Sequence, residues 1–560
     1  MTTLGLRLAL VATLAAAIPA ASPSAAMVAA SGQPPAQEPQ SPLAQAVRSE
    51  IVRGAGAAER AFYAARGYAP LWLAQDGSAT SAAAALLDWA GRADAQALPP
   101  ARYDTESLRK ELGAAQGPAG RAELELGLTR LYLTYARDLS SGLLEPRDVS
   151  PELDVTPPRP DPAHLLGQAA EASDMPAFLS SLAPADPEYR RLLDLYGKIR
   201  QIARAGGWGP TVPDGPTLRL GDRSPRVAQL RARLTAMGDL RKVDRVAASN
   251  VMNDAAPADR DPERHGAALE AAIKRFQARH GLNTDGAVGP NTLAAINTTA
   301  ETRARQVAIN LERLRWLNRD MRQRHILINL AGFRMSLIED GQTRFSTQTI
   351  VGQAKDHRTP EFNDQLEYIV VNPNWNVPRS IATKEILPEL RKDPTYLEQN
   401  NMELIGADEP ATMIDWNAVT PSSFAWRIRQ LPGPDNALGA VKFLFPNSHS
   451  IYMHDTPAHR LFRYDRRDFS HGCIRLEHPV SFAHLLLSYQ SSDPAALFDR
   501  LRAKPGEHWV RLERPIPVYV TYRTAWVEPD GTWQFRADVY QRDELVAAAL
   551  RAAGVQLVGS

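Results

Sequence analysis

Residues 451–475 read IYMHDTPAHRLFRYDRRDFSHGCIR and contain the single cysteine of the 560-residue chain, Cys473. Gly472 precedes this thiol, and glycine lets the backbone approach a reacting group closely. His454 lies nineteen positions upstream, at the end of a predicted strand over residues 450–453. In an arrangement of two strands and a loop, the histidine reaches the thiol.

A thiol beside an imidazole is a common way to make a nucleophile. His454 would accept the proton, and the thiolate of Cys473 would attack a carbonyl. The backbone N–H groups of Gly472 and Cys473 could then bind the oxyanion that forms. Six of the 12 histidines lie between His449 and His484, but their spacing matches no zinc pattern, so we predict no metal site.

Composition limits the class of protein. Apolar residues make up 44% and charged residues 23% of the chain, which is typical of globular domains, and the length predicts several of them. Lys plus Arg number 64 against 63 Asp plus Glu, and no basic run stands out. A nucleic-acid partner is therefore not expected, because phosphate binding requires a basic surface. One cysteine excludes an intramolecular disulfide.

The N-terminus predicts export. Arg7 precedes an apolar stretch over 8–18, and small residues follow, which is the layout of a signal peptide over residues 1–30. Cleavage after Ala26 and cleavage after Ala30 both fit. A linker follows over 31–42. In an exported chain, a lone thiol is either buried or chemically employed.

Helical periodicity dominates the first half of the chain. Residues 43–205 predict a helical scaffold domain, and residues 206–300 predict a small helical module that contains a polar loop at 241–265. Ser224 is placed as the N-cap of its first helix. A connecting helix is expected within 301–323.

The pattern then changes to alternation with a period of two, which predicts a mostly β domain over 324–504. A helix and loops at 378–432 interrupt it, and we expect this insert to fold over the β core as a lid. Residues 505–560 predict a C-terminal extension with a hairpin and a helix. The fold class is therefore multidomain α+β. The predicted strands are 325–330, 334–338, 344–351, 368–371, 440–445 and 450–453, and those of the hairpin are 517–527 and 532–539.

The module over 206–300 resembles the peptidoglycan-binding module of many wall-active enzymes. The resemblance covers about 85 residues and implies binding to glycan strands or stem peptides, without naming binding residues. The residues that carry it are Leu220-Gly-Asp222, Val227, Leu230, Leu234, Phe276-Gln277, Gly281-Leu282, Asp285-Gly286 and Gly289-Pro290.

The segment around Cys473 resembles the signature of the L,D-transpeptidases, whose catalytic domain is of the YkuD type. The signature is a histidine, a spacer, then Ser/Thr-His-Gly-Cys, any residue, and Arg or Asn. The order of domains is similar to that of the large YcbB-like members. The matching residues are Tyr452, His454, Ser470-His-Gly-Cys473 and Arg475, with further matches at Val351-Gly352, Thr359-Pro360, Asn372-Pro-Asn-Trp375 and Val377-Pro378.

The resemblance implies a role for each matching residue. Cys473 would be the nucleophile and His454 the general base. Tyr452 would help the oxyanion hole formed with Gly472, and His471 would lie beside the thiol. Ser470 is expected to orient the loop.

Two further residues keep alternatives open. Arg475 would bind a substrate carboxylate or hold the loop, the alternative being an ion pair with Asp465 or Glu477. Trp375 would line the donor cleft or pack in a core.

The implied reaction needs no metal or cofactor. Cys473 would attack the amide after the third residue of a tetrapeptide stem, expel D-Ala, and pass the acyl group to a neighbouring stem amine as a 3→3 cross-link. Water or a protein amine could replace that acceptor, and a non-catalytic binding scaffold is a further alternative. The family also implies peptidoglycan as partner, carbapenem-type β-lactams as covalent inhibitors, and a periplasmic, wall-associated location.

Overall fold

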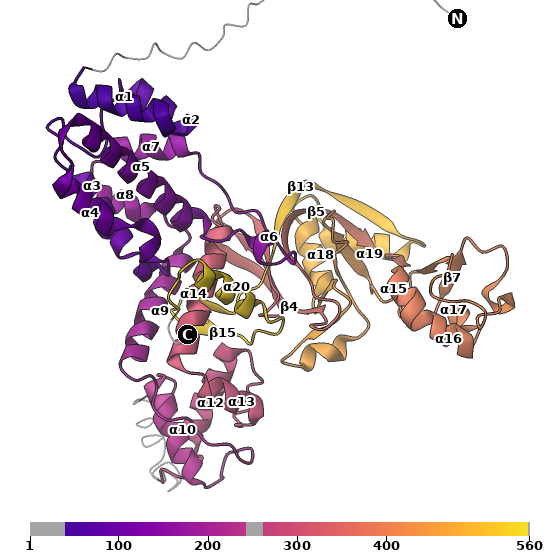
Figure 1. Ribbon diagram of the computed structural model, residues 1–560. Coiled ribbons are helices and arrows are strands. Elements are labelled where there is room, and N and C mark those ends of the chain that lie inside the picture. The colour runs from indigo at the N-terminus through magenta and orange to yellow at the C-terminus, as the bar shows by residue number, and fades with distance from the viewer. Residues whose placement is uncertain (1–39, 242–260, 558–560) are drawn as a thin grey trace, which may run out of the picture.

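The structure is a computed structural model that describes residues 40–241 and 261–557. The predicted signal, most of the predicted linker and most of the 241–265 loop lie outside these residues. Within them a helical domain, a small helical module and a β domain with an insert surround a central helix, as Figure 1 shows. The predicted multidomain α+β class is confirmed. None of the described helices has the length and apolarity to cross a membrane.

The N-terminal helical domain packs around one long helix, α5 (Gly117–Ser141). Ser41 and Thr80 each precede the first turn of a helix in this domain. Their side chains accept hydrogen bonds from backbone N–H groups of that turn and so cap the helix. The buried Glu125 of α5 accepts a 2.7 Å bond from the hydroxyl of Tyr63. The other helices are α1 (Pro42–Gly54), α2 (Ala57–Ala65), α3 (Ser81–Gly91), α4 (Thr105–Ala114), α6 (Pro146–Val149), α7 (Pro162–Glu171), α8 (Met175–Ser181) and α9 (Pro187–Arg204).

The small module consists of α10 (Pro225–Ala236), α12 (Ala267–His280) and α13 (Pro290–Asn297) around an apolar core. Ser224 caps α10 as predicted, accepting a 3.3 Å bond from the Arg226 N–H. The Gln277 side chain holds the loop between the last two helices, because its amide donates to Asp285 and its oxygen accepts from Gly286 N–H.

Helix α14 (Ala300–Trp316) is buried along its whole length and joins the parts of the molecule. It packs against α9 and against the C-terminal helix α20 (Arg542–Ala552). The buried Arg315 bonds the carboxylate of Glu312 at 3.0 Å and the hydroxyl of Tyr189. The predicted connecting helix is therefore the shared core of the molecule.

The β domain is a ten-stranded sheet that closes on itself, because β9 pairs with both β10 and β5. Apolar side chains fill its interior, and α18 (Pro479–Leu487) and α19 (Pro494–Ala503) add to that core. The strands are β1 (Leu153–Asp154), β2 (His325–Asn329), β3 (Arg334–Glu339), β4 (Gln342–Gly352), β5 (Glu361–Val371), β9 (Val441–Leu444), β10 (Met453–His454), β11 (Asp468–Ser470), β12 (Ile474–Leu476) and β13 (His508–Thr521).

Two strands of this sheet come from outside the predicted β domain. β13 lies between β5 and β2, so the expectation of a separate extension from residue 505 was wrong. Glu513, Arg514 and Pro515 break its alternation where the register shifts between Arg511 and Ile516, which hid the strand. The hairpin consists only of β14 (Ala525–Val527) and β15 (Trp533–Phe535). β1 of the helical domain pairs with β5.

The insert does not fold over the β core as predicted, but forms a small subdomain that projects from the barrel, as Figure 1 shows. It has its own apolar core, in which Trp416 is buried, and a three-stranded sheet in the order β6-β8-β7. More of it is regular than the sequence predicted. Its elements are β6 (Trp375–Asn376), α15 (Arg379–Ile381), a π-helical turn (Ala382–Ile386), α16 (Leu387–Lys392), α17 (Tyr396–Gln399), β7 (Met402–Ile405) and β8 (Arg427–Gln430).

Candidate active site

Strand pairing places the candidate residues on one face of the sheet. β10 and β12 are parallel neighbours, with His454 opposite Arg475 and Met453 opposite Ile474. Side chains alternate along a strand, so Tyr452 and Cys473, one pair earlier, face the same side as His454 and Arg475. His454 and Cys473 are one strand and two residues apart, roughly 8 Å between their Cα atoms. The intervening Met453 and Ile474 point into the core and anchor both strands.

The loop that carries the thiol, residues 470–473 (the Cys473 loop), is held by its own polar groups. The hydroxyl of Ser470 donates to the carbonyl of Cys473 at 2.5 Å and accepts the Gly472 N–H at 3.2 Å. Ser470 therefore orients the loop. Gly472 has φ +112°, a conformation that favours glycine.

This arrangement corrects one sequence expectation. The Gly472 N–H is directed at Ser470 and is not available to an oxyanion. The Gly472 carbonyl is also engaged, since it accepts a 2.7 Å bond from the hydroxyl of Thr359. The Cys473 N–H has no acceptor among the described residues. The backbone N–H and the hydroxyl of Tyr452 both donate to the thiol.

The Cys473 thiol is half-buried, and it donates a long 3.8 Å hydrogen bond to the Ser450 carbonyl. Burial raises its pKa above the ordinary value, although hydrogen bonds from Tyr452 and the positive charge of Lys442 act in the opposite direction. In the free protein at neutral pH the group is therefore a thiol.

His454 is buried, and its Nδ1 lies 2.5 Å from the carbonyl oxygen of Asp455. Nδ1 therefore carries the proton, which leaves Nε2 as the acceptor. Burial, with the charges of Arg475 and Lys442, lowers the pKa of His454 to about 3. The imidazole is neutral at pH 7 and can accept a proton.

We expect alkylation of Cys473 by iodoacetamide to accelerate about tenfold per pH unit from pH 7 to 9, because only the thiolate reacts and its pKa is raised. A small cysteine peptide of pKa ~8.5 should level off near its pKa, whereas Cys473 should not. Mass spectrometry at timed intervals measures both rates. A rate independent of pH between 5 and 8 would instead indicate a preformed thiolate–imidazolium pair.

Arg475 has neither of the ion pairs considered as alternatives. Within the described ranges the Asp465 side chain accepts from the Arg466 N–H, and Glu477 lies 3.6 Å from His478. The Nε of Arg475 is buried without a hydrogen-bond partner in the described part of the chain. Its guanidinium therefore has no carboxylate partner among the described residues.

Sequence reasoning missed Lys442. This residue of β9 lies opposite His454, and its Nζ lies 5.2 Å from the centre of the Tyr452 ring. Burial lowers its pKa, and the nearby Cys473 opposes that change. A single lysine in an alternating strand gives no signal in the sequence, because its neighbours come from three other strands.

His471 lies elsewhere than expected, whereas Trp375 packs against a core, which is one of its two predicted alternatives. The centre of the His471 ring lies 4.5 Å from that of His357, with the two planes tilted by 41°, and the His471 Nε2 lies 2.6 Å from Glu385 of the insert. In the described structure His471 thus links the Cys473 loop to the insert and makes no hydrogen bond to the thiol. Trp375 lies in β6 and packs against the apolar core of the insert.

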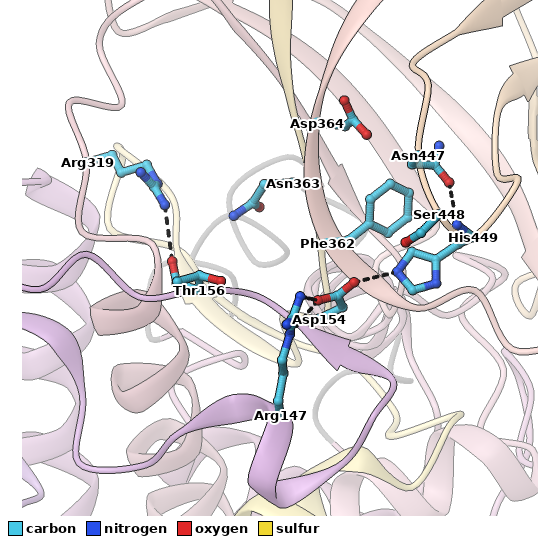
Figure 2. Close-up of a pocket in the computed structure, with 10 residues that line it drawn as sticks. All are labelled: Arg147, Asp154, Thr156, Arg319, Phe362, Asn363, Asp364, Asn447, Ser448 and His449. Carbon is cyan, nitrogen blue, oxygen red and sulfur yellow. Dashed lines mark hydrogen bonds and ion pairs between the residues drawn. The ribbon is translucent and has the colours of Figure 1, made fainter.

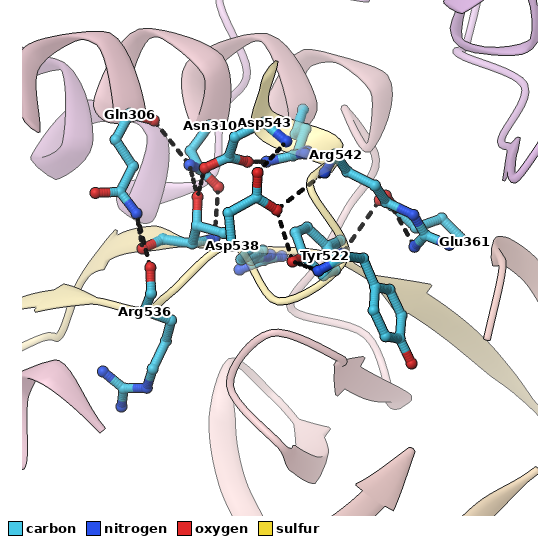
Figure 3. A network of polar contacts seen from close by, with 12 residues as sticks. Gln306, Asn310, Glu361, Tyr522, Arg536, Asp538, Arg542 and Asp543 are labelled. Carbon is cyan, nitrogen blue, oxygen red and sulfur yellow. Dashed lines mark hydrogen bonds and ion pairs between the residues drawn. The ribbon is translucent and has the colours of Figure 1, made fainter. Parts of the chain in front are cut away.

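The C-terminal segment supports the Cys473 loop from behind. The Tyr540 hydroxyl donates to the Gly352 carbonyl at 2.6 Å, and the buried Arg542 donates to the Thr359 carbonyl at 2.8 Å. Figure 3 shows Arg542 beside Asp538 and Glu361 in a network that reaches α14. Sequence reasoning missed this support, because about 180 residues separate its partners.

A cavity of about 300 Å³ lies where the helical domain meets the sheet (Figure 2). Asp154 of β1 bonds His449 at 2.8 Å and also pairs with Arg147. Partial burial raises the pKa of Asp154, but the bonds to His449 and Arg147 outweigh that effect and lower the pKa below its ordinary value. No cysteine lines this cavity in the described structure, but His449 precedes Ser450, whose carbonyl accepts from the thiol.

Comparisons with known families agree with this geometry. Residues 323–520 match the family "L,D-transpeptidase catalytic domain", residues 223–296 match "Putative peptidoglycan binding domain", and residues 57–195 match "Scaffold domain". The β domain is therefore a YkuD-type L,D-transpeptidase catalytic domain. The chain joins it to a peptidoglycan-binding domain and a helical scaffold domain.

Individual relatives match parts of the chain. This chain is 32% identical over 259 residues to a Haemophilus influenzae protein named "Putative L,D-transpeptidase". The match covers 45% of this chain and 51% of that protein. The chain thus matches about half the length of that relative. It is 38% identical over 89 residues to the N-acetylmuramoyl-L-alanine amidase CwlM of Mycobacterium tuberculosis, covering 16% and 20% of the two chains.

Two crystal structures of L,D-transpeptidases are also similar at 15% identity. The one from Xylanimonas cellulosilytica has a TM-score of 0.17 and covers 56% of this chain and 100% of its own. The one from Stackebrandtia nassauensis has a TM-score of 0.20 and covers 56% and 97%. The assignment rests on the sequence matches.

Proposed function

We propose that this protein is a peptidoglycan L,D-transpeptidase that forms 3→3 cross-links through a thioester on Cys473. The observation that carries the proposal is the shared sheet face of Tyr452, His454, Cys473 and Arg475 within a domain of this family. The peptidoglycan-binding domain supports the same substrate and association with the cell wall. Export to the periplasm is part of the proposal.

The first half-reaction transfers the stem to the protein. The Cys473 thiol gives its proton to Nε2 of the neutral His454 as sulfur attacks the amide carbonyl. Tyr452 and the Cys473 N–H stabilise the oxyanion. D-Ala leaves as the C–N bond breaks, taking the proton from His454, and a thioester remains.

The second half-reaction consumes the thioester. The side-chain amine of a neighbouring stem attacks, His454 removes its proton, and the thiol is restored. No external energy source is needed, since one amide replaces another. Arg475 and Lys442 are the cations that would hold stem carboxylates on this face.

Product analysis tests this proposal. The full chain is incubated with tetrapeptide muropeptides, and mass spectrometry identifies a cross-linked dimer after loss of D-Ala. A tripeptide product alone would mean that water is the acceptor. Attachment of the stem to an added protein would mean that a protein amine is the acceptor. A carbapenem should add its mass to Cys473 in the same preparation. Absence of any product and of any adduct would favour a binding scaffold.

The insert is proposed to act as a lid over the donor stem. Its contact with the Cys473 loop is the bond between Glu385 and His471. Limited proteolysis within 378–432 should slow severalfold when a carbapenem occupies Cys473, because a bound ligand orders a gating segment. In Glu385→Gln the protection should weaken. Equal cleavage with and without the ligand would remove the lid role.

A further inference from the structure

A groove of about 1220 Å³ runs between the peptidoglycan-binding module and the β domain. The module contributes residues 281–284 and 291–298 to one side. The barrel contributes the β2–β3 turn at 331–334, the loop at 354–358 and the loop at 462–467. Both sides therefore belong to parts of the chain already assigned to peptidoglycan.

The groove is strongly cationic. Eight Lys or Arg residues line it, against two Asp. Arg358 and Arg466 pair with Glu152 and Asp468, and the other six form no ion pair with a carboxylate among the described residues. They are Arg303, Arg334, Lys355, Arg463, Arg467 and Arg536.

Two of these cations are fixed by neutral groups. Arg467 donates to the carbonyls of Thr349 and Phe333, and Arg536 donates to the carbonyl of Arg279. Carbonyls orient a guanidinium without cancelling its charge. Burial lowers the pKa of each arginine to about 10, although Glu477 and Asp465 near Arg467 and Glu528 near Arg536 oppose the change. Both arginines therefore remain charged at neutral pH, and neither forms a direct ion pair within the described part of the chain.

The open rim of the groove carries groups suited to a sugar–peptide chain. Arg334, Lys355 and Arg463 are exposed there. Tyr464 exposes 56% of its surface, and Asn291 of the module lines the opposite side. Exposed aromatic rings and amides match sugars, and free cations match carboxylates.

The groove leads to the back of the Cys473 loop. The loop at 462–467 continues directly into β11, which ends at Ser470. The Gln353 N–H, next to the 354–358 wall, donates to the Ser470 carbonyl at 2.9 Å. A ligand in the groove would therefore lie beside the segment that positions Cys473.

We propose that this groove binds a strand of peptidoglycan through the free carboxylates of its stem peptides, between the binding module and the Cys473 loop. This inference rests on the proposed function, which supplies the polymer. The strand is an anionic chain of sugars and peptides, and the groove presents unpaired cations along its length. Its occupancy would keep stems near the site between turnovers.

The test measures binding of the full chain to insoluble sacculi in a Cys473→Ala background, which prevents turnover. Arg334, Lys355 and Arg463 are changed together to Glu. The control changes Lys110, Arg190 and Arg514 to Glu, three exposed cations outside the groove, and alters net charge equally. At low salt the groove variant should bind about tenfold more weakly and the control should be unchanged.

A second arm identifies the anion. Amidating the carboxylates of the sacculi should weaken binding by the protein with an unchanged groove about as much as the triple substitution weakens binding to native sacculi. Equal binding by the groove variant, or undiminished binding to amidated sacculi, would overturn the proposal.

Failure of the proposed function is measured separately. With Cys473 intact, the groove variant should react with a small soluble stem peptide at the normal rate, since such a ligand does not span the groove. If the unmodified protein also fails to react with the soluble stem peptide, the catalytic proposal is wrong, whatever the measured binding to sacculi. Equal melting temperatures of the two triple variants exclude misfolding as the cause.

Discussion

Replacing Cys473 by serine is expected to lower turnover of a tetrapeptide stem at least ~10³-fold, because a hydroxyl is far harder to deprotonate than a thiol. His454→Ala should lose about 10²–10⁴-fold at neutral pH through loss of the proton acceptor. The two groups act as a unit, so the double variant should be little worse than Cys473→Ser alone. Product formation by mass spectrometry measures all three.

The pH dependence separates the two roles. His454→Ala retains the thiol, so its reaction with a carbapenem should recover partly as pH rises and thiolate forms unaided. Cys473→Ser should form no adduct at any pH. His478→Ala, an exposed histidine that pairs only with Glu477, is the matched control and should behave as the unmodified protein. Fast adduct formation without His454, or an adduct on another residue, would contradict these roles.

Gly352→Ala is expected to destabilise the protein by about 3 kcal/mol and to abolish most activity. A Cβ at this position would overlap the carbonyl oxygen of His357 and lie 2.8 Å from the Thr359 nitrogen. These are backbone atoms and cannot move aside cheaply. Gly352 also packs on Gly472, so any adjustment would displace the Cys473 loop.

The control for that substitution is Gly167→Ala in α7, where nothing lies within 4 Å of the added Cβ. It should be neutral or slightly stabilising, because alanine is the better helix former. Thermal unfolding and carbapenem adduct formation measure stability and site geometry in both variants. A Gly352→Ala protein with an unchanged melting temperature would show that the loop tolerates displacement.

Local patterns predicted much of the architecture. Caps such as Ser224, helical periodicity and the change to alternation over 325–338 depend on neighbours in the chain, and the structure confirms the corresponding elements. β13 was misassigned because Glu513 and Pro515 interrupt its pattern, while its pairing with β5 and β2 is long-range.

The same distinction applies to the candidate site. The motif from His454 to Arg475 was visible in the sequence because all its members lie within one short segment. Lys442, the Tyr540 and Arg542 support, and the separation of His471 from the thiol were not visible. Each depends on which strand or subdomain lies opposite, and no local spacing encodes that.

The sequence by itself therefore determined the fold class and named the candidate thiol and imidazole, because short-range spacing and residue chemistry suffice for both. Only the tertiary structure decided the protonation states of Cys473 and His454 and the direction of the Gly472 N–H, since burial and partners from distant segments set them. The cationic groove likewise exists only in the tertiary structure, because its two sides meet when the module packs beside the barrel.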